Sequence, residues 1–105
     1  MQDVLLVLST FPDAEMAEKI TSELVAGKLA ACANILPALK SIYRWQDEVQ
    51  KANETLVLFK TTTARFPDLQ EKLRAAHPYE VPEIICLPIA DGLPEYLRWV
   101  SANCA

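Results

Sequence analysis

Glycine is almost missing from this chain: Gly27 and Gly92 are the only two among 105 residues. A glycine-rich loop of the kind that cradles phosphate groups is therefore excluded. The sequence also contains no GxSxG pattern and no zinc-peptidase signature, and Cys32 has no evident base beside it. Because the usual signatures of catalysis are absent, we expect a protein that is not an enzyme.

Cysteine and histidine are scarce as well. The three cysteines, Cys32, Cys86 and Cys104, form no CxxC pair, and an odd number does not suit a disulfide framework. Cys32 and Cys86 stand in apolar runs, so we interpret them as small buried residues of a protein in a reducing compartment. His77 is the only histidine.

Basic charge and long apolar runs are also lacking. The formal net charge of −4 argues against nucleic acid as a partner. No apolar run approaches the roughly 20 residues that a membrane-spanning helix needs. Asp3 interrupts the first apolar stretch and no basic leader precedes it, so we expect no signal peptide. A cytoplasmic protein that binds neither nucleic acid nor membrane is the expectation.

What the chain does contain is material for one core. Apolar residues make up 51% and charged residues 23% of the sequence, as in ordinary globular proteins. A chain of this length folds as one domain, which we place at residues 1–105. Hydrophobic periodicity and turn residues predict strands at 4–8, 31–45, 49–62 and 84–87, and helices at 12–27, 67–76 and from 94 onward.

The order of these elements predicts the fold class. We expect an α+β protein, a ferredoxin-like β-α-β-β-α-β antiparallel sandwich with an additional C-terminal helix. In such a fold both helices cover one sheet face. The opposite face must then be polar or be covered by a partner, and the apolar residues of the hairpin and the terminal helix favour a partner.

The most unusual feature is the long hairpin at residues 31–62. Fifteen extended residues span roughly 50 Å, whereas a compact domain of this size is only about 35 Å across. The hairpin must therefore bend, break or project, and Pro37 predicts a bulge or an edge strand. A regular strand would place the odd-numbered residues, among them Ile35, Tyr43 and Trp45, on one face.

The outer half of the hairpin indicates an oligomer. Projection would leave Leu39, Ile42, Tyr43 and Trp45 in water, and exposed contiguous apolar surface usually marks a contact site. Tyr43 and Trp45 also suit stacking on a ligand.

A second candidate site is the stiff segment at residues 77–83, which carries an imidazole, a phenol and carboxylates between two prolines. One interpretation is a divalent-metal site through His77 and Glu83. The other is a rigid helix-to-strand connection whose polar groups satisfy the backbone. Lys60, at the end of an apolar run, suits either anion binding or a strand end with its amine in solvent.

Several blocks of the sequence resemble one known family. They are residues 27–34 (GKLAACAN), 42–45 (IYRW), 54–56 (ETL) with Lys60-Thr61, 77–83 (HPYEVPE) and 96–99 (YLRW). In their order and content these blocks look like the CutA divalent-cation tolerance family, and they cover nearly the whole chain.

This resemblance implies a tight homotrimer in which long hairpins reach across to neighbours, with an architecture similar to PII signalling proteins. It also implies a role in tolerance of divalent metals, copper especially. The copper site described in the family uses a cysteine after the first strand and histidines at the end of the second helix. The matching positions here are Ser9, Ala76 and His77, so only His77 keeps a ligand of that set.

Two function hypotheses follow. The first is a non-enzymatic cytoplasmic trimer of the metal-ion response, which requires no cofactor and binds copper or another divalent cation weakly, if at all, near His77 and Glu83. The alternative is a PII-like signalling module that binds a small anionic ligand or a protein partner in clefts between subunits. We expect such clefts to be lined by Lys60, Tyr43, Trp45, Tyr79 and Glu83.

Overall fold

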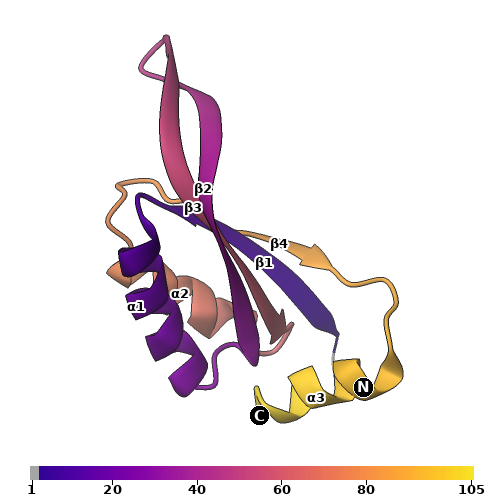
Figure 1. Cartoon of the computed structure of the whole chain (residues 1–105). Helices are drawn as coiled ribbons and strands as arrows, with labels where there is room; N and C mark the ends of the chain where they lie inside the picture. Colours follow the sequence, from indigo (N-terminus) through magenta and orange to yellow (C-terminus); the bar gives the residue numbers. More distant parts are fainter. Residues whose placement is uncertain (1–2) are drawn as a thin grey trace.

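The computed structural model describes residues 3–105, which form a four-stranded antiparallel sheet and three helices (Figure 1). The elements are β1 (Val4–Phe11), α1 (Ala14–Ala26), β2 (Cys32–Trp45), β3 (Glu48–Thr62), α2 (Phe66–Ala76), β4 (Ile85–Pro88) and α3 (Pro94–Ala102). This order confirms the predicted α+β class and the β-α-β-β-α-β arrangement with a terminal helix. None of the helices within residues 3–105 is long and apolar enough to cross a membrane.

The sheet has the strand order β2-β3-β1-β4, so β1 is central and β2 and β4 are edges. β1 runs three residues beyond the predicted end, because Ser9, Thr10 and Phe11 continue the ladder with β3. The β-branched and aromatic residues there suit a strand better than a turn.

Helices α1 and α2 cover one face of the sheet, as Figure 1 shows. Their apolar stripes pack on the odd-numbered residues of β1 and β3, which point to that face because side chains alternate along a strand. The buried residues of this core include Val7, Phe11, Ile20, Leu24, Leu29, Val57, Phe59, Leu69 and Leu73.

The start and end of α1 follow from local chemistry. The Asp13 side chain accepts a hydrogen bond of 2.8 Å from the Met16 amide and so caps the helix, as its position predicts. The helix ends at Gly27, where the next residue, Lys28, takes the left-handed conformation with φ 61°.

The opposite face of the sheet is largely uncovered, and we call it the open sheet face. Its members follow from the strand register, in which Leu6 pairs with Leu87 and Leu8 pairs with both Ile85 and Leu58. Ile85 and Leu87 remain 50% and 48% exposed. The open sheet face comprises Leu6, Leu8, Leu36, Leu56, Leu58, Ile85 and Leu87, with Cys32, Asn34 and Lys60 beside them. Within one chain, the central strand β1 is therefore covered on the helix side only.

Helix α3 closes just one end of that face (Figure 1). Val4, Ala31, Val100 and Cys104 form a small second core beneath it. The interpretation of Cys86 as buried is wrong for the single chain, since Cys86 lies on the edge strand β4 and is exposed.

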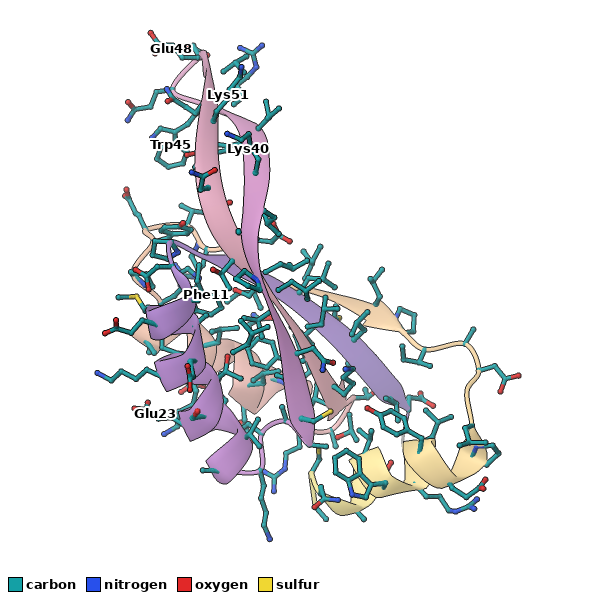
Figure 2. All side chains as sticks on the ribbon, in the orientation of Figure 1. Phe11, Glu23, Lys40, Trp45, Glu48 and Lys51 are labelled. Carbon is teal, nitrogen blue, oxygen red and sulfur yellow. The ribbon has the colours of Figure 1, made fainter. Side chains whose placement is uncertain are left out.

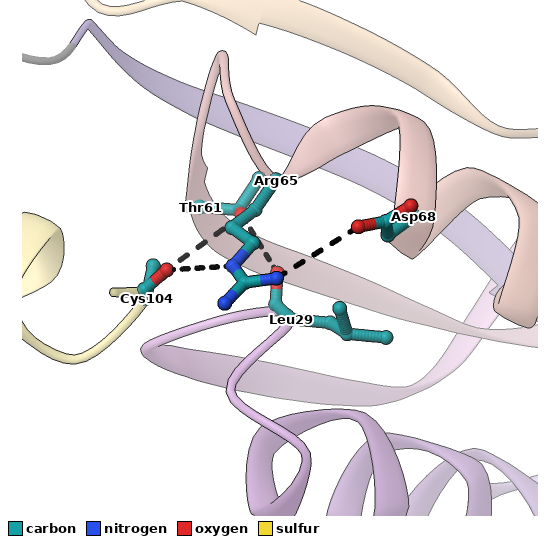
Figure 3. A network of polar contacts seen from close by, with 5 residues as sticks. All are labelled: Leu29, Thr61, Arg65, Asp68 and Cys104. Atoms are coloured by element: carbon teal, nitrogen blue, oxygen red, sulfur yellow. Dashed lines mark hydrogen bonds and ion pairs between the residues drawn. The ribbon is translucent and has the colours of Figure 1, made fainter.

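A polar network fastens the end of the chain to the sheet (Figure 3). Thr61 Oγ1 donates a buried hydrogen bond of 2.7 Å to the Leu29 carbonyl, and Arg65 Nε donates one of 2.8 Å to the Cys104 carbonyl. Asp68 Oδ2 lies 3.8 Å from Nη1 of the same Arg65 guanidinium. Burial raises the pKa of the Cys104 thiol, which contacts Thr61.

The outer half of the β2–β3 hairpin projects beyond the core, as its length predicts (Figure 1). The molecule extends 44 Å along its longest axis but only 26 and 22 Å along the others. Trp45 pairs with Glu48, so the loop has two residues, Gln46 and Asp47, with φ of 51° and 65°. Positive φ at both positions is typical of the type I′ turn, whose twist matches that of the strands.

A bulge divides β2 at Pro37, as predicted. Leu36 pairs with Leu56 and Leu39 pairs with Glu54, so Pro37 and Ala38 together oppose a single residue of β3. Ala38 adopts a left-handed φ of 62°. The extra residue reverses the alternation of β2, because a shift by one residue moves every side chain to the other face.

The reversal corrects the prediction of one odd-numbered face. Ala33 and Ile35 pack on the core beneath the helices. Beyond the bulge, Tyr43 and Trp45 pair with Gln50 and Glu48, even-numbered residues of β3 like those of the open sheet face. The bulge thus aims these two aromatic rings to the same side of the sheet as Glu54.

Candidate functional site

A cleft of about 810 Å³ lies between the outer half of the hairpin and the connection from α2 to β4. In Figure 2 the Trp45 side chain leaves the hairpin on the side where that connection lies. The lining residues are Thr10, Ser41, Ile42, Tyr43, Trp45, Glu54, Pro78, Tyr79, Glu80, Val81, Pro82 and Glu83.

Four of the five residues predicted to line a ligand cleft are brought together here. Tyr43 and Trp45 come from β2, and Tyr79 and Glu83 come from the stiff connection after α2. They meet because the hairpin rises directly beside that connection (Figure 1). Tyr43 and Trp45 are 44% and 45% exposed, so their rings form an accessible wall.

Lys60, the fifth predicted residue, is not part of this lining. It lies six positions along β3 from Glu54, a span of about 20 Å in an extended strand. Its amine donates a hydrogen bond to Asn34 Oδ1 on the open sheet face. Lys60 therefore belongs to a different part of the surface.

His77 lies behind the cleft, only 8% exposed. Its Nε2 is 2.8 Å from the Thr10 carbonyl, and its Nδ1 accepts a hydrogen bond of 3.1 Å from the Tyr79 amide. This pattern requires the neutral ring with its proton on Nε2. Burial lowers the pKa of His77, opposed by the Thr10 bond and the charge of Glu54. The ring also stacks on Phe11 with centroids 4.6 Å apart.

These contacts bear on metal binding. Because both ring nitrogens of His77 are bonded to backbone groups, a cation could be ligated only if one of those bonds were exchanged. Among residues 3–105, no three His, Cys, Asp or Glu side chains come together as a metal-binding group. A divalent-cation site at His77 and Glu83 therefore stays a prediction.

The other two positions matched to a copper site by the family resemblance, Ser9 and Ala76, carry neither a cysteine nor a histidine. Ser9 is fully buried on the helix side of β1, and its hydroxyl has no hydrogen-bond partner among the described residues. Ala76 is the last residue of α2 and is exposed.

Tyr79 and Glu54 form the shortest polar contact of the cleft. The Tyr79 hydroxyl donates a hydrogen bond of 2.6 Å to Glu54 Oε2. Burial, together with this bond and the charge of Glu54, raises the pKa of Tyr79, so the phenol stays protonated and remains the donor. This short bond to an ionisable partner fixes the ring of Tyr79 against the hairpin.

Glu54 is the functional residue that the sequence analysis missed. It is 9% exposed although it carries a carboxyl group. A signal was present: Glu54 stands where the polar outer half of the return strand changes to the apolar run at residues 56–59. A carboxylate at the boundary of a buried strand needs a partner, and Tyr79 provides it.

The electrostatics of the cleft favour cations. Three of its lining residues, Glu54, Glu80 and Glu83, carry carboxyl groups, and none of its lining residues is a lysine, arginine or histidine. A concave, partly desolvated surface lined by one sign of charge raises the local concentration of the opposite sign.

Comparison with known proteins gives the same family as the sequence blocks. The family model of the CutA1 divalent ion tolerance protein matches residues 5–103. The chain is 53% identical over 103 residues to the divalent-cation tolerance protein CutA of Thermus thermophilus, covering 98% of each chain. It is 42% identical over 91 residues to mouse Protein CutA, covering 87% of this chain and 51% of the mouse protein.

Solved structures agree in fold. The Cut A1 protein of Thermus thermophilus superposes with a TM-score of 0.94 over 97% of this chain and 99% of its own. CutA from Xylella fastidiosa, 41% identical, gives a TM-score of 0.95 over 98% and 99% of the two chains. The chain belongs to the CutA1 divalent ion tolerance protein family.

Proposed function

We propose that this chain is a non-enzymatic, cytoplasmic homotrimer that acts in the tolerance of divalent cations, copper among them. The observation that carries the proposal is the family match over residues 5–103, since that family is described by divalent ion tolerance. The Thermus thermophilus relative carries the same description.

The trimeric state is supported by the open sheet face. Leu36, Ile85 and Leu87 are each more than two-fifths exposed there, although their neighbours in the sheet are leucines. A contiguous apolar sheet face left in water is unfavourable, at about 25 cal/mol for each Å². On the projecting hairpin Leu39, Tyr43 and Trp45 continue this side of the sheet and Ile42 lies on the other side, and we expect all four to contact neighbouring subunits.

Direct binding of divalent cations is weak in this proposal. Glu83 supplies an accessible carboxylate on the cleft, and His77 becomes a ligand only after its ring leaves the Thr10 carbonyl or the Tyr79 amide. The hydrogen bonds lost in that exchange oppose binding, at about 1 kcal/mol each.

Isothermal calorimetry with Cu²⁺ and Zn²⁺ tests this site. We expect weak heats for the wild-type protein that decrease in Glu83→Gln and in His77→Ala, while Glu71→Gln on the exposed side of α2 leaves them unchanged. Identical isotherms for wild type and His77→Ala would remove His77 from the site.

Growth under copper stress tests the biological role. Expression in a host that lacks its own member of the family is expected to restore growth at raised copper concentration. Full restoration by a Glu83→Gln variant that has lost the calorimetric heat would show that tolerance does not depend on this cation site.

A PII-like signalling function is the second candidate, and Lys60 favours it. Its cationic amine lies on the apolar open sheet face beside Asn34, where a neighbouring subunit would complete an anion pocket. A thermal-shift screen against nucleotides and small anionic metabolites tests it. Stabilisation by an anion that disappears in Lys60→Ala would support this function, and stabilisation unchanged in Lys60→Ala would remove Lys60 from it.

A further inference from the structure

We propose that the cleft beneath the hairpin binds a small organic cation, an alkylammonium or alkylguanidinium compound. This inference goes beyond a role in metal tolerance and does not depend on it. It rests on three features of one surface: aromatic walls, carboxylates without cationic partners, and a volume suited to a small organic molecule.

The aromatic walls come from two sides. Tyr43 and Trp45 stand on the hairpin, and Tyr79 faces them from the connection after α2. An ammonium or guanidinium group over the face of such a ring is attracted by the ring quadrupole, most strongly over tryptophan. The bulge at Pro37 and Ala38 creates this wall, because it turns the hairpin aromatics to the side of the sheet where Glu54 lies.

Glu54 provides the negative charge at the base of the cleft. Its side chain is more than nine-tenths buried and it lines the cleft. The Tyr79 hydroxyl bonds to Oε2, and no hydrogen bond to Oε1 is made by any residue within 3–105. Oε1 is not one of the buried polar atoms that lack a partner, so it faces the solvent of the cleft, where an ammonium or guanidinium N–H would donate to it in place of water.

Glu80 and Glu83 add negative charge elsewhere on the same lining. They are exposed, so their contribution is attraction at long range more than a fixed contact. The Arg65–Asp68 pair, the one ion pair formed within residues 3–105, involves none of these carboxylates.

The size of the cleft distinguishes an organic cation from a metal ion. A volume of about 810 Å³ is within the range of small-molecule sites. The carboxylates do not gather as a three-ligand metal group within residues 3–105. Spaced carboxylates between aromatic faces suit a cation that is large, weakly hydrated and partly apolar.

Nuclear magnetic resonance of the full chain tests the proposal. The two tryptophans, Trp45 in the cleft and Trp99 on α3, give separate indole N–H signals. The probes are n-butylammonium chloride, n-butylguanidinium chloride, uncharged n-pentanol and sodium butyrate. We expect the two cations to shift the Trp45 signal in a saturable manner, with little effect of pentanol or butyrate and no shift of Trp99.

Matched variants locate the charge that matters. In Glu54→Gln, and in the double variant Glu80→Gln with Glu83→Gln, we expect the dissociation constant of butylammonium to rise roughly fivefold or more. Glu71→Gln on α2 removes one negative charge, as Glu54→Gln does, but lies outside the cleft. It should bind butylammonium as tightly as wild type does. The double variant alters only exposed side chains and so tests the proposal even if Glu54→Gln fails to fold.

Three results would overturn the inference. The first is an equal response of Trp45 to pentanol and butylammonium, which would show a purely apolar site. The second is the absence of a Trp45 shift at about 50 mM cation, well above the dissociation constant of a useful site. The third is a Trp45 signal that changes on dilution of the protein and not on addition of cation, which would show that the subunit contacts proposed for Trp45 leave no room for a cation.

Discussion

At the scale of single residues, His77 shows how a sole histidine can have a structural task. Its ring joins the end of β1 to the connection after α2, through the Thr10 carbonyl and the Tyr79 amide. Phe11 and Tyr79 pack on it, with ring centroids 4.6 and 4.9 Å away. These contacts hold Tyr79 where it can bond to Glu54 and so shape the cleft.

Because burial lowers the pKa of His77 from its ordinary 6.5, the folded chain binds this proton less tightly than the unfolded chain does. The corresponding part of the free energy of unfolding is present above pH 6.5 and is lost as the pH falls through the lower pKa of the folded state. Protonation would also set an N–H on Nδ1 against the Tyr79 amide. We therefore expect wild type to lose more stability than His77→Gln between pH 7.5 and pH 5.

Urea denaturation at several pH values, at one protein concentration, measures this difference. Parallel losses in wild type and His77→Gln would assign the acid sensitivity to carboxyl groups elsewhere.

Thr61 carries the second residue-scale prediction. Its hydroxyl is fully buried and donates to the Leu29 carbonyl at 2.7 Å (Figure 3). Thr61→Val keeps the shape and leaves that carbonyl without a donor, which should lower the free energy of unfolding by about 1–3 kcal/mol. Thr63→Val, at an exposed threonine, should change it by less than about 0.5 kcal/mol. Equal changes in the free energy of unfolding for the two substitutions would show that the buried hydrogen bond of Thr61 adds no stability of its own.

Local chemistry predicted some residues well and others not at all. Asp13 was predictable as a helix cap because its carboxylate, its position before an amphipathic run and the preceding proline all favour the same structure. The surroundings of Lys60 and Glu54 were not predictable. The strand face that lies near a given loop depends on strand register and sheet twist. No property of the local sequence predicts that the Tyr79 hydroxyl lies 2.6 Å from Oε2 of Glu54, a residue 25 positions earlier.

At the scale of elements, the bulge in β2 is the decisive irregularity. Pro37 removes one donor from the ladder, and Ala38 accepts a left-handed conformation that only glycine, asparagine and aspartate adopt readily. The sequence predicted an irregularity at Pro37 but not its size. A one-residue bulge and a simple edge proline are both compatible with the same letters, yet they send Tyr43 and Trp45 to opposite faces.

Ala38→Gly tests the energetic side of this bulge. Because glycine has no Cβ, it relieves the left-handed strain at φ 62°, and we expect the free energy of unfolding to rise by about 0.5–1 kcal/mol. Ala52→Gly in the regular part of β3 should lower it by a similar amount. Urea denaturation of the two variants compares them directly, and a loss of stability in both would show that Ala38 is not strained.

At the scale of the whole molecule, the β2–β3 hairpin and the open sheet face both expose large apolar side chains. The chain can bury the helix side of its sheet by itself, but within residues 3–105 it has no element to cover Leu36, Ile85 and Leu87. The long axis of 44 Å likewise places aromatic residues far from the core. Order and type of elements were predictable from periodicity, whereas the proposed subunit contacts of these surfaces depend on a second copy of the chain and not on the local sequence pattern.

Trp45→Ala should weaken the proposed trimer before it unfolds the subunit. Trp45 is outside both cores of the single chain, so its loss costs little intramolecular packing. Val49→Ala is the matched control, since Val49 is exposed on the same hairpin but pairs with Arg44 and alternates to the other side. Light scattering over a dilution series is expected to show dissociation of Trp45→Ala at concentrations where Val49→Ala stays assembled. An intact trimer with a lowered melting temperature in Trp45→Ala would count against this role.

The mass of the wild-type particle in solution decides most directly whether other copies of the chain cover the open sheet face. Native mass spectrometry at micromolar concentration should give one dominant species of three times the 11.7 kDa chain mass. A dominant species of a single 11.7 kDa chain over the whole concentration range would show that no second copy covers that face.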